Sequence, residues 1–257
     1  MIRLGVCTAA DNIDRAARGG CDYIELGFAA VADMTEAEYG RALSLVRNGS
    51  IGVEAMNGFI PGRYRITGPE ADIAPIQEFL RGGLARAREM GVKVIVFGSS
   101  GARKMPEGFT DKAKAEEQCA QFLRMAGPMA ESFGMRIAIE PLCYREDNVI
   151  NTVSDAVRLA RNVSLPSVGV LADYYHMLYN KEGVGGIAEA GALLWHCHIA
   201  RGDTRTVPAR GDGEDYKAFF DALRAIGYNG RVSVEGRIND FDAEIGPGIA
   251  LMRELCG

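Results

Sequence analysis

The chain has 257 residues, of which 47% are hydrophobic and 25% charged, and its formal net charge is −5 at pH 7. This length suits one barrel of eight βα units as well as two small domains, and the hydrophobic fraction is enough for a sizeable core. The negative charge, without a Lys/Arg cluster as long as a basic arm, argues against nucleic acid or an anionic membrane surface as a partner. A small-molecule substrate is the better expectation.

The cysteines and the apolar runs bear on the cellular compartment. Six cysteines are scattered along the chain without a CxxC pair, which favours reduced thiols over a disulfide framework. No signal-peptide pattern precedes the first strand-like run at Ile2, and no apolar run approaches the length of about 18 residues typical of a membrane span. We therefore expect a cytoplasmic protein with no membrane partner.

Eight apolar, β-branched runs of strand length alternate with amphipathic helical stretches. These runs occupy 2–7, 22–27, 51–57, 93–99, 136–141, 168–173, 193–200 and 231–235. Such alternation indicates βα units around a parallel sheet, and eight units favour a closed barrel. We predict a single (β/α)8 TIM barrel domain over residues 1–257. The competing doubly wound open sheet is disfavoured because the first βα turn, CTAADN, lacks a GxGxxG fingerprint.

The first half of the chain carries weaker functional signals. Glu25 ends the run DYIEL and is expected to face the rim of the barrel. In EAMNGFIPG, Asn57 could supply a polar contact and Phe59 an apolar lid. The segment FGSSGARKMPEGF could form a substrate-facing turn at 98–101, although without GK[ST] it is not a P-loop. Glu25 and Asn57 are therefore candidate substrate-binding residues.

The strongest signal is four polar side chains that close four consecutive apolar runs in the second half. They are Glu140, Asp173, His198 and Glu235. The active site of a βα barrel lies at the carboxyl ends of its strands, so these side chains should meet at one rim. Three carboxylates and one imidazole suit a divalent ion such as Mn²⁺, Mg²⁺, Co²⁺ or Zn²⁺. We predict a catalytic metal site.

Glu140 and Glu235 are candidate catalytic residues because they lie on the fifth and eighth runs and could face each other across the barrel mouth. Two opposed carboxylates suit proton abstraction next to a carbonyl, in which one removes the proton and the other returns one from the opposite face. A metal ion would polarise the carbonyl. The alternative is that both are rim glutamates in surface salt bridges.

Other polar residues near these runs are candidates for substrate contacts. His176, in DYYH, could hold a metal-bound water or a substrate hydroxyl. His196 should lie one layer deeper than His198, as buried support or core. The long loop ARGDTRTVPARGDG offers Arg205 as a substrate-orienting cation, with Arg201 and Arg210 as competitors. Glu146, after IEPL, could accept hydrogen bonds from sugar hydroxyls.

At these residues the chain resembles the xylose isomerase-like barrel superfamily of sugar isomerases and epimerases, and within it the ketose 3-epimerases. The motifs run essentially end to end and occur in the family's order: DYIEL, MNGF, VFGSSGARKMP, IEPL with NVINT, DYYHM, HCHIA and VSVEG. The resemblance implies that Glu140, Asp173, His198 and Glu235 bind one divalent ion and that the two glutamates exchange the proton. It also implies that His176, Arg205 and Glu146 touch a sugar substrate.

Two departures from the family pattern concern substrate choice. Cys143, Tyr144 and Arg145 follow EPL where the epimerases commonly have Asn-Arg, and the loop before Arg205 is one residue longer. The leading hypothesis is a 3-epimerase or isomerase of a small keto sugar. An inosose or keto-acid dehydratase and an aldose–ketose isomerase are enzyme alternatives in the same fold.

Two further alternatives belong to other classes of function. A DNA-repair endonuclease of the superfamily would need many histidines for a zinc cluster, and the chain has three. A carbohydrate-binding barrel would bind metal without turnover. Assembly into a homo-oligomer stays open.

Overall fold

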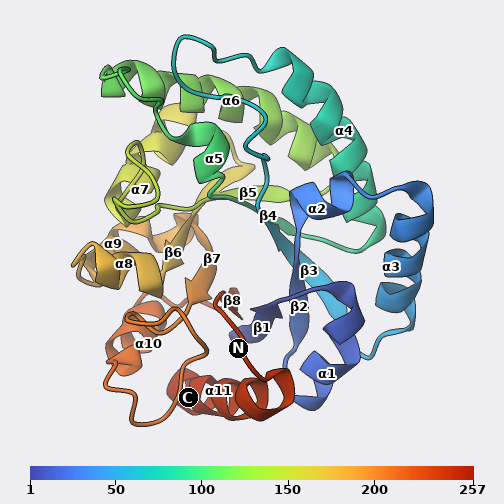
Figure 1. The fold of residues 1–257 in the computed structure, drawn as a ribbon. Coiled ribbons are helices and arrows are strands. Elements are labelled where there is room, and N and C mark those ends of the chain that lie inside the picture. Colours follow the sequence, from blue (N-terminus) through green and yellow to red (C-terminus); the bar gives the residue numbers. More distant parts are fainter.

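The computed structural model describes residues 1–257. Eight parallel strands form one closed barrel in chain order, with β1 pairing with β8 to complete the ring (Figure 1). The strands are β1 Arg3–Cys7, β2 Tyr23–Gly27, β3 Gly52–Asn57, β4 Val94–Phe97, β5 Arg136–Ile139, β6 Val168–Asp173, β7 Leu194–Ile199 and β8 Arg231–Val234. The predicted (β/α)8 fold is therefore confirmed, and each strand lies within a predicted run.

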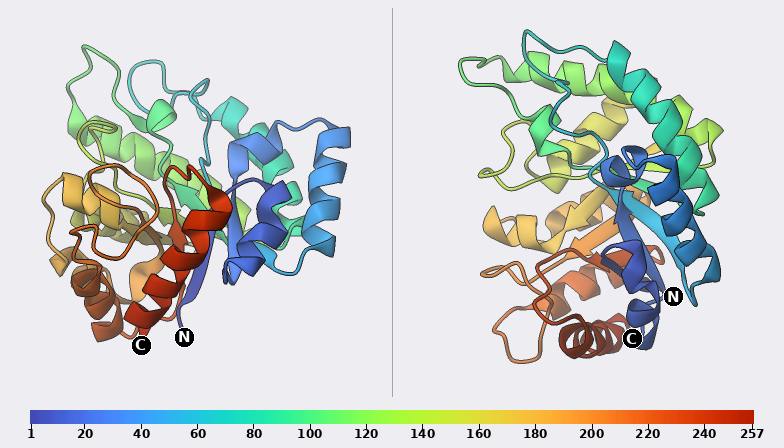
Figure 2. Two further views of the ribbon diagram at one scale, coloured as in Figure 1. Left: turned by 60° about the horizontal axis from the view of Figure 1, so that its bottom comes forward. Right: turned by 45° about the vertical axis from the view of Figure 1, so that its right-hand side comes forward.

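Helices surround the barrel and connect its strands (Figures 1 and 2). They are α1 Ile13–Arg18, α2 Phe28–Ala32, α3 Glu36–Asn48, α4 Ala74–Glu89, α5 Ser100–Arg103, α6 Lys112–Ser132, α7 Val153–Val163, α8 Tyr174–Tyr179, α9 Gly185–Ala190, α10 Tyr216–Ala225 and α11 Phe241–Cys256, with 3₁₀ turns at Ala10–Asn12 and Gly191–Leu193. None of these helices combines the length and the apolar character that crossing a membrane requires.

Helix α7 illustrates why these segments are helical. Thr152 begins it with a capping box, in which its side chain accepts from the backbone N–H of Asp155 and the Asp155 carboxylate accepts from the backbone N–H of Thr152. Its buried residues recur at helical spacing and form one stripe, Val153, Ala156, Val157, Leu159, Ala160 and Val163. This stripe is the face of α7 that packs into the main core.

Along each strand, side chains point alternately to the outside and to the inside of the barrel. One set packs outward against the helices in the main core. The other set faces the barrel interior, where a small apolar cluster contains Tyr23, Ala55, Val94, Val96, Ala138 and Leu171. A Cβ on Gly5 would lie 2.5 Å from the Tyr23 ring, so the missing side chain leaves room for that ring. Above this apolar floor the interior becomes polar.

Candidate metal centre and active site

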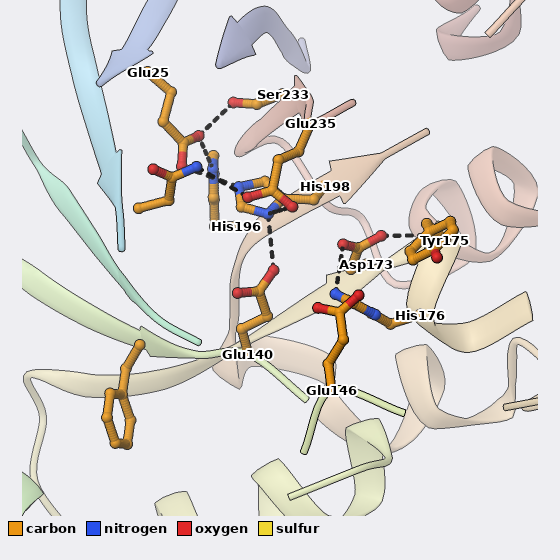
Figure 3. Close-up of polar contacts among 12 residues, drawn as sticks. Glu25, Glu140, Glu146, Asp173, Tyr175, His176, His196, His198, Ser233 and Glu235 are labelled. Carbon is orange, nitrogen blue, oxygen red and sulfur yellow. Dashed lines mark hydrogen bonds and ion pairs between the residues drawn. The ribbon is translucent and has the colours of Figure 1, made fainter. Parts of the chain in front are cut away.

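The carboxyl ends of β5 to β8 bring the predicted site residues together (Figure 3). Glu140 directly follows β5, Asp173 ends β6, His198 lies in β7 and Glu235 directly follows β8. One oxygen of each of the three carboxylates lies within 4.8 Å of the other two, in a group that also includes a nitrogen of His176. The parallel strands thus place acidic residues from distant parts of the sequence around one point.

His198 lies beside this group, outside the set of atoms within 4.8 Å of one another, and contacts two of its carboxylates through one ring nitrogen. Its Nδ1 lies 2.9 Å from Glu140 Oε1 and 3.7 Å from Glu235 Oε2, whereas its Nε2 lies 3.0 Å from Glu25 Oε1. A neutral imidazole carries one hydrogen. Since the Glu25 carboxylate can only accept, neutral His198 carries its hydrogen on Nε2. The Nδ1 lone pair then faces two carboxylates, an arrangement that requires a cation or a proton between them.

The second histidine near the carboxylates, His176, has the same tautomer but turns its protonated nitrogen toward them. The backbone N–H of Cys143 donates to His176 Nδ1 at 3.1 Å, so neutral His176 carries its hydrogen on Nε2. Burial lowers the pKa of His176, which keeps the ring neutral. Its Nε2–H is a donor and cannot bind a metal. Of the two histidines at the rim, His198 therefore has the nitrogen suited to a cation, and His176 has a hydrogen to donate.

Two buried polar atoms of the site have no hydrogen-bond partner. Asp173 Oδ1 accepts from the backbone N–H of Tyr175 at 2.7 Å, but Asp173 Oδ2 is buried without a hydrogen-bond partner. His176 Nε2 is also without one and lies 3.6 Å from that oxygen. A buried unpartnered carboxylate oxygen is costly unless something binds it. The free Asp173 oxygen, the adjacent glutamates and the His198 lone pair fit a divalent cation.

The electrostatics of the carboxylate cluster point the same way. Burial and the negative charge of Glu235 raise the pKa of Glu140, and the same two causes raise the pKa of Asp173 to about 6. Burial also acts on Glu235, but His198 and Arg205 outweigh it and lower the pKa of that carboxyl. Acidic groups whose mutual repulsion raises their pKa values form a site where positive charge is favoured.

Arg205 is the loop arginine that reaches the site. Its guanidinium donates to Glu146 Oε1 at 3.0 Å and to Glu235 Oε2 at 2.8 Å, and it lies over the Tyr175 ring at 4.6 Å. Its competitors pair elsewhere, Arg201 with Asp203 and Arg210 with Glu254. Of the three loop arginines, Arg205 is the one whose guanidinium contacts the carboxylates of the site, and its role toward a substrate stays a prediction.

The backbone around Arg205 is held in an unusual conformation. Its φ is +49°, a left-handed value that a side chain disfavours. Its carbonyl accepts from the backbone N–H of Arg237 at 2.7 Å, and a Cβ on Gly236 would lie 2.6 Å from that oxygen. The absent side chain at 236 thus permits the contact that fixes the loop and aims the guanidinium at the carboxylates.

Asn57 also lies at the site, where its side-chain amide donates to Glu235 Oε1 at 2.9 Å. Two other residues lie elsewhere than expected. Phe59 is fully buried against Phe28 and Phe122, so the predicted apolar lid is instead part of the core. Glu25 is fully buried beneath His198, and the rim position we expected for it is wrong, because its side chain points into the barrel interior.

Two buried residues that support the site, Arg103 and Asp147, are absent from the candidates that the sequence offered. Arg103 is fully buried, donates to the backbone carbonyl of Glu140 at 2.9 Å and pairs with the equally buried Asp147 at 2.7 Å. A Cβ on Gly98 would lie 2.1 Å from Glu140 Oε2. Arg103 is a charged residue near an apolar run, a pattern that is typical of a surface position. The local sequence pattern therefore gives no indication that Arg103 is buried.

A comparison with known proteins places this geometry in a family. Residues 13–255 match the family model described as xylose isomerase-like TIM barrel. The chain is 25% identical over 248 residues to a D-psicose 3-epimerase of Ruminiclostridium cellulolyticum, covering 95% of this chain and 83% of that protein. It is 36% identical over 121 residues to a 3-dehydro-D-guloside 4-epimerase of Escherichia coli, covering 47% and 45% of the two chains.

Solved structures share the fold. A D-psicose 3-epimerase crystallised in the presence of D-fructose superimposes with a TM-score of 0.88 at 20% identity, covering 100% of both chains. A 3-keto-D-glucoside 4-epimerase from E. coli gives 0.80 at 22% identity, covering 99% and 100%.

The fold and the site define a barrel enzyme whose chemistry takes place at the carboxyl ends of its strands. The chain belongs to the xylose isomerase-like TIM barrel family. Its curated relatives are epimerases, and it is an enzyme of the isomerase class.

Proposed function

We propose that this enzyme epimerises a keto sugar at the carbon next to the carbonyl, at C3 of a ketose. The observation that carries the proposal is the pair Glu140 and Glu235, two buried or half-buried carboxylates with one oxygen each inside a single 4.8 Å group. The pKa of Glu140 is raised and that of Glu235 lowered, so the two carboxyls differ in their affinity for a proton. Relatives named D-psicose 3-epimerase support the choice of C3.

Glu140, Asp173, Glu235 and Nδ1 of His198 are the proposed ligands of one divalent ion, with Mn²⁺, Co²⁺, Mg²⁺ and Zn²⁺ as candidates. This set is rich in oxygen and contains one imidazole, which suits those ions and not a soft metal that prefers thiolates. A structural neighbour with a TM-score of 0.74 and 18% identity is described as binding a zinc atom. When bound, such an ion would polarise the carbonyl and stabilise negative charge as it develops on oxygen.

The two glutamates would perform the proton transfer. One carboxylate removes the proton from the carbon next to the carbonyl, and the electron pair left behind is delocalised into the carbonyl. The other carboxyl delivers a proton to the opposite face of the same carbon, which inverts its configuration. Asn57 donates to Glu235 Oε1 and Arg205 to Oε2, so both oxygens of this glutamate have fixed directions.

The residues that surround the pair would orient the sugar. His176 Nε2–H is a free donor, and Glu146 and Arg205 are paired with each other at the half-exposed mouth. A hydroxyl-rich substrate can accept from Arg205 and His176 and donate to Glu146. These three contacts would fix the ring or chain of the sugar above the carboxylates.

The test is a screen of ketoses, aldoses and their phosphates with Mn²⁺, Co²⁺ or Mg²⁺, followed by turnover of any substrate in D₂O. Two-base epimerisation should place deuterium on the inverted carbon, and Glu140→Gln or Glu235→Gln should each nearly abolish turnover, with metal content measured alongside. Label next to a new aldehyde would indicate an aldose–ketose isomerase, and a product lighter by one water a dehydratase. Turnover without label would contradict proton exchange with solvent.

A second candidate, epimerisation at C4 of a 3-keto glycoside, is favoured by the identity of 36% over 121 residues to the 3-dehydro-D-guloside 4-epimerase. The proton removed there is also next to a carbonyl, so the same carboxylate pair serves. Supplying 3-keto glycosides in the screen and locating the deuterium at C3 or C4 by NMR distinguishes the two.

A further inference from the structure

We infer that Glu25 is a positioning residue that fixes the tautomer of His198, so that Nδ1 is available to a divalent cation. This inference rests on the metal site proposed above and concerns a residue outside it. Glu25, from β2, lies on the opposite side of the His198 ring from Glu140 and Glu235 (Figure 3). It is fully buried, and so are both histidines that it contacts.

Three donors converge on the Glu25 carboxylate. Oε1 lies 3.0 Å from His198 Nε2, and Oε2 lies 2.7 Å from His196 Nε2 and accepts from the Ser233 hydroxyl at 2.6 Å. Tyr23 contacts the same hydroxyl at 2.7 Å, which extends the network to the apolar floor of the barrel. Because both oxygens are engaged from fixed strands, the carboxylate has little freedom to turn.

Each donor must bring its own hydrogen to an ionised carboxylate, which accepts only. This determines the position of the hydrogen on His198. If it sat on Nδ1 instead, Nε2 and Glu25 Oε1 would be two acceptors 3.0 Å apart in a site without water access, and Nδ1 would present a donor where the cation binds. A carboxylate behind a metal-binding histidine commonly fixes its tautomer and orientation in this way.

His196 has a separate role in this arrangement. Its Nδ1 is buried without a partner, so the ring gains a hydrogen bond only through Glu25. Its ring stands edge to face against that of His198, with centroids 4.9 Å apart. His196 therefore hydrogen-bonds Glu25 and packs against His198, and it is not part of the group formed by Glu140, Asp173 and Glu235. This agrees with the buried supporting position expected from its strand parity.

The first test measures Mn²⁺ affinity of the full-length protein by titration calorimetry. Glu25→Gln keeps the shape but leaves one acceptor oxygen for three donors, and we expect the dissociation constant to rise roughly 10- to 100-fold. The matched control is Glu182→Gln, a half-buried glutamate whose carboxylate contacts the backbone N–H of Val153 and none of the site residues. Its Mn²⁺ affinity should equal that of the wild type. Glu25→Gln affinity within about threefold of the wild type would overturn the inference.

A second measurement is made on the wild type and does not depend on how Glu25→Gln folds. The chain has only three histidines, so ¹⁵N-histidine NMR of the wild type loaded with diamagnetic Zn²⁺ gives three imidazole patterns, assigned with His176→Gln and His196→Gln. We expect hydrogen on Nε2 of His198, and hydrogen on Nδ1 would overturn the inference. A wild type that binds no divalent ion would overturn the proposed metal site as well. Normal metal affinity in Glu25→Gln would remove only the role of Glu25.

Discussion

Gly98 matters at the residue scale because a larger residue would occupy the place of the Glu140 carboxylate. A Cβ at this position would lie 2.1 Å from Oε2, the end of a side chain that can move at little cost to the fold. We expect Gly98→Ala to lower kcat/KM by roughly 100-fold through a displacement on the order of 1 Å, with near-normal thermal unfolding. Steady-state kinetics and calorimetry check both parts.

The control for Gly98→Ala is Gly82→Ala, in helix α4, where an added Cβ meets nothing within 4 Å. It should leave kcat/KM unchanged and raise stability by about 0.5–1 kcal/mol, since alanine is the better helix former. If Gly98→Ala had wild-type kinetics, the reaction would not depend on the exact position of the Glu140 carboxylate.

Arg205 gives a second prediction at the same scale. Removing its guanidinium by Arg205→Ala should reduce kcat/KM by an amount equivalent to about 1.5–3 kcal/mol while metal content stays unchanged, because the residue is proposed to contact substrate. Arg210→Ala, in the same loop but paired with exposed Glu254, is the matched control and should have no effect. Loss of metal in Arg205→Ala would instead mean that the guanidinium mainly holds Glu235 in place.

At the scale of elements, two loops are joined beneath the site. Arg103 ends α5 in the β4–α6 connection and Asp147 lies in the β5–α7 connection, and their fully buried ion pair links the two. Removing one partner leaves an uncompensated buried charge, so Arg103→Met should lower the free energy of unfolding by about 3–5 kcal/mol. Urea denaturation measures this change in the free energy of unfolding.

The exposed pair of Arg81 and Glu78 on α4 is the comparison, and Arg81→Ala should cost about 0–1 kcal/mol. If Arg103→Met cost no more than this surface variant, the two loops would be held by their backbone contacts and not by the ion pair.

The stability of the fold should depend on pH through Glu182, whose carboxylate accepts from the backbone N–H of Val153 at the start of α7. Burial, together with the nearby Asp155 and Glu189, raises the pKa of Glu182 to about 7 against the hydrogen bond from Val153, and Glu182 Oε2 has no partner. A raised carboxyl pKa means that the folded protein binds the proton more tightly than the unfolded chain. The contribution to stability is therefore complete below pH 4.5 and is lost as the pH rises toward about 7.

The measurement is the difference in free energy of unfolding between wild type and Glu182→Gln from pH 4 to pH 8. Glutamine keeps the acceptor for Val153 but does not titrate, so the wild type should lose stability relative to the variant across this interval. A difference that does not change with pH would show that the Glu182 pKa is not raised.

At the scale of the whole molecule, the metal should stabilise the fold. A ligand that binds only the folded state at about 100 times its dissociation constant adds about 2.7 kcal/mol, which for a chain of this size raises Tm by roughly 5–10 °C. We expect Mn²⁺ to raise Tm, a chelator to reverse the change, and Asp173→Asn to show little of it while keeping the α8 cap. An equal rise in Asp173→Asn would point to binding elsewhere.

The sequence was sufficient to predict the barrel because strand length, β-branched content and helical stripes are local properties. It also predicted the position of Glu140, Asp173, His198 and Glu235 at the ends of β5 to β8, since each lies within one residue of the last residue of its strand. The support of the site could not be predicted the same way. Glu25 meets His198 across 173 positions and Arg103 meets the Glu140 carbonyl across 37, and such contacts depend on barrel register and on side-chain direction.

Closure of the barrel brings the chain ends together. β1 pairs with β8, α11 packs against α1, and the two termini lie near each other in every view (Figures 1 and 2). A short linker could therefore join them, with new ends opened at the exposed Glu107 and Gly108 between β4 and β5. In this circular permutant the strands that carry Glu140, Asp173, His198 and Glu235 would leave the ribosome first. Expression of this permutant would test whether strands β5 to β8 bring these side chains together before Glu25 and Asn57 have been synthesised.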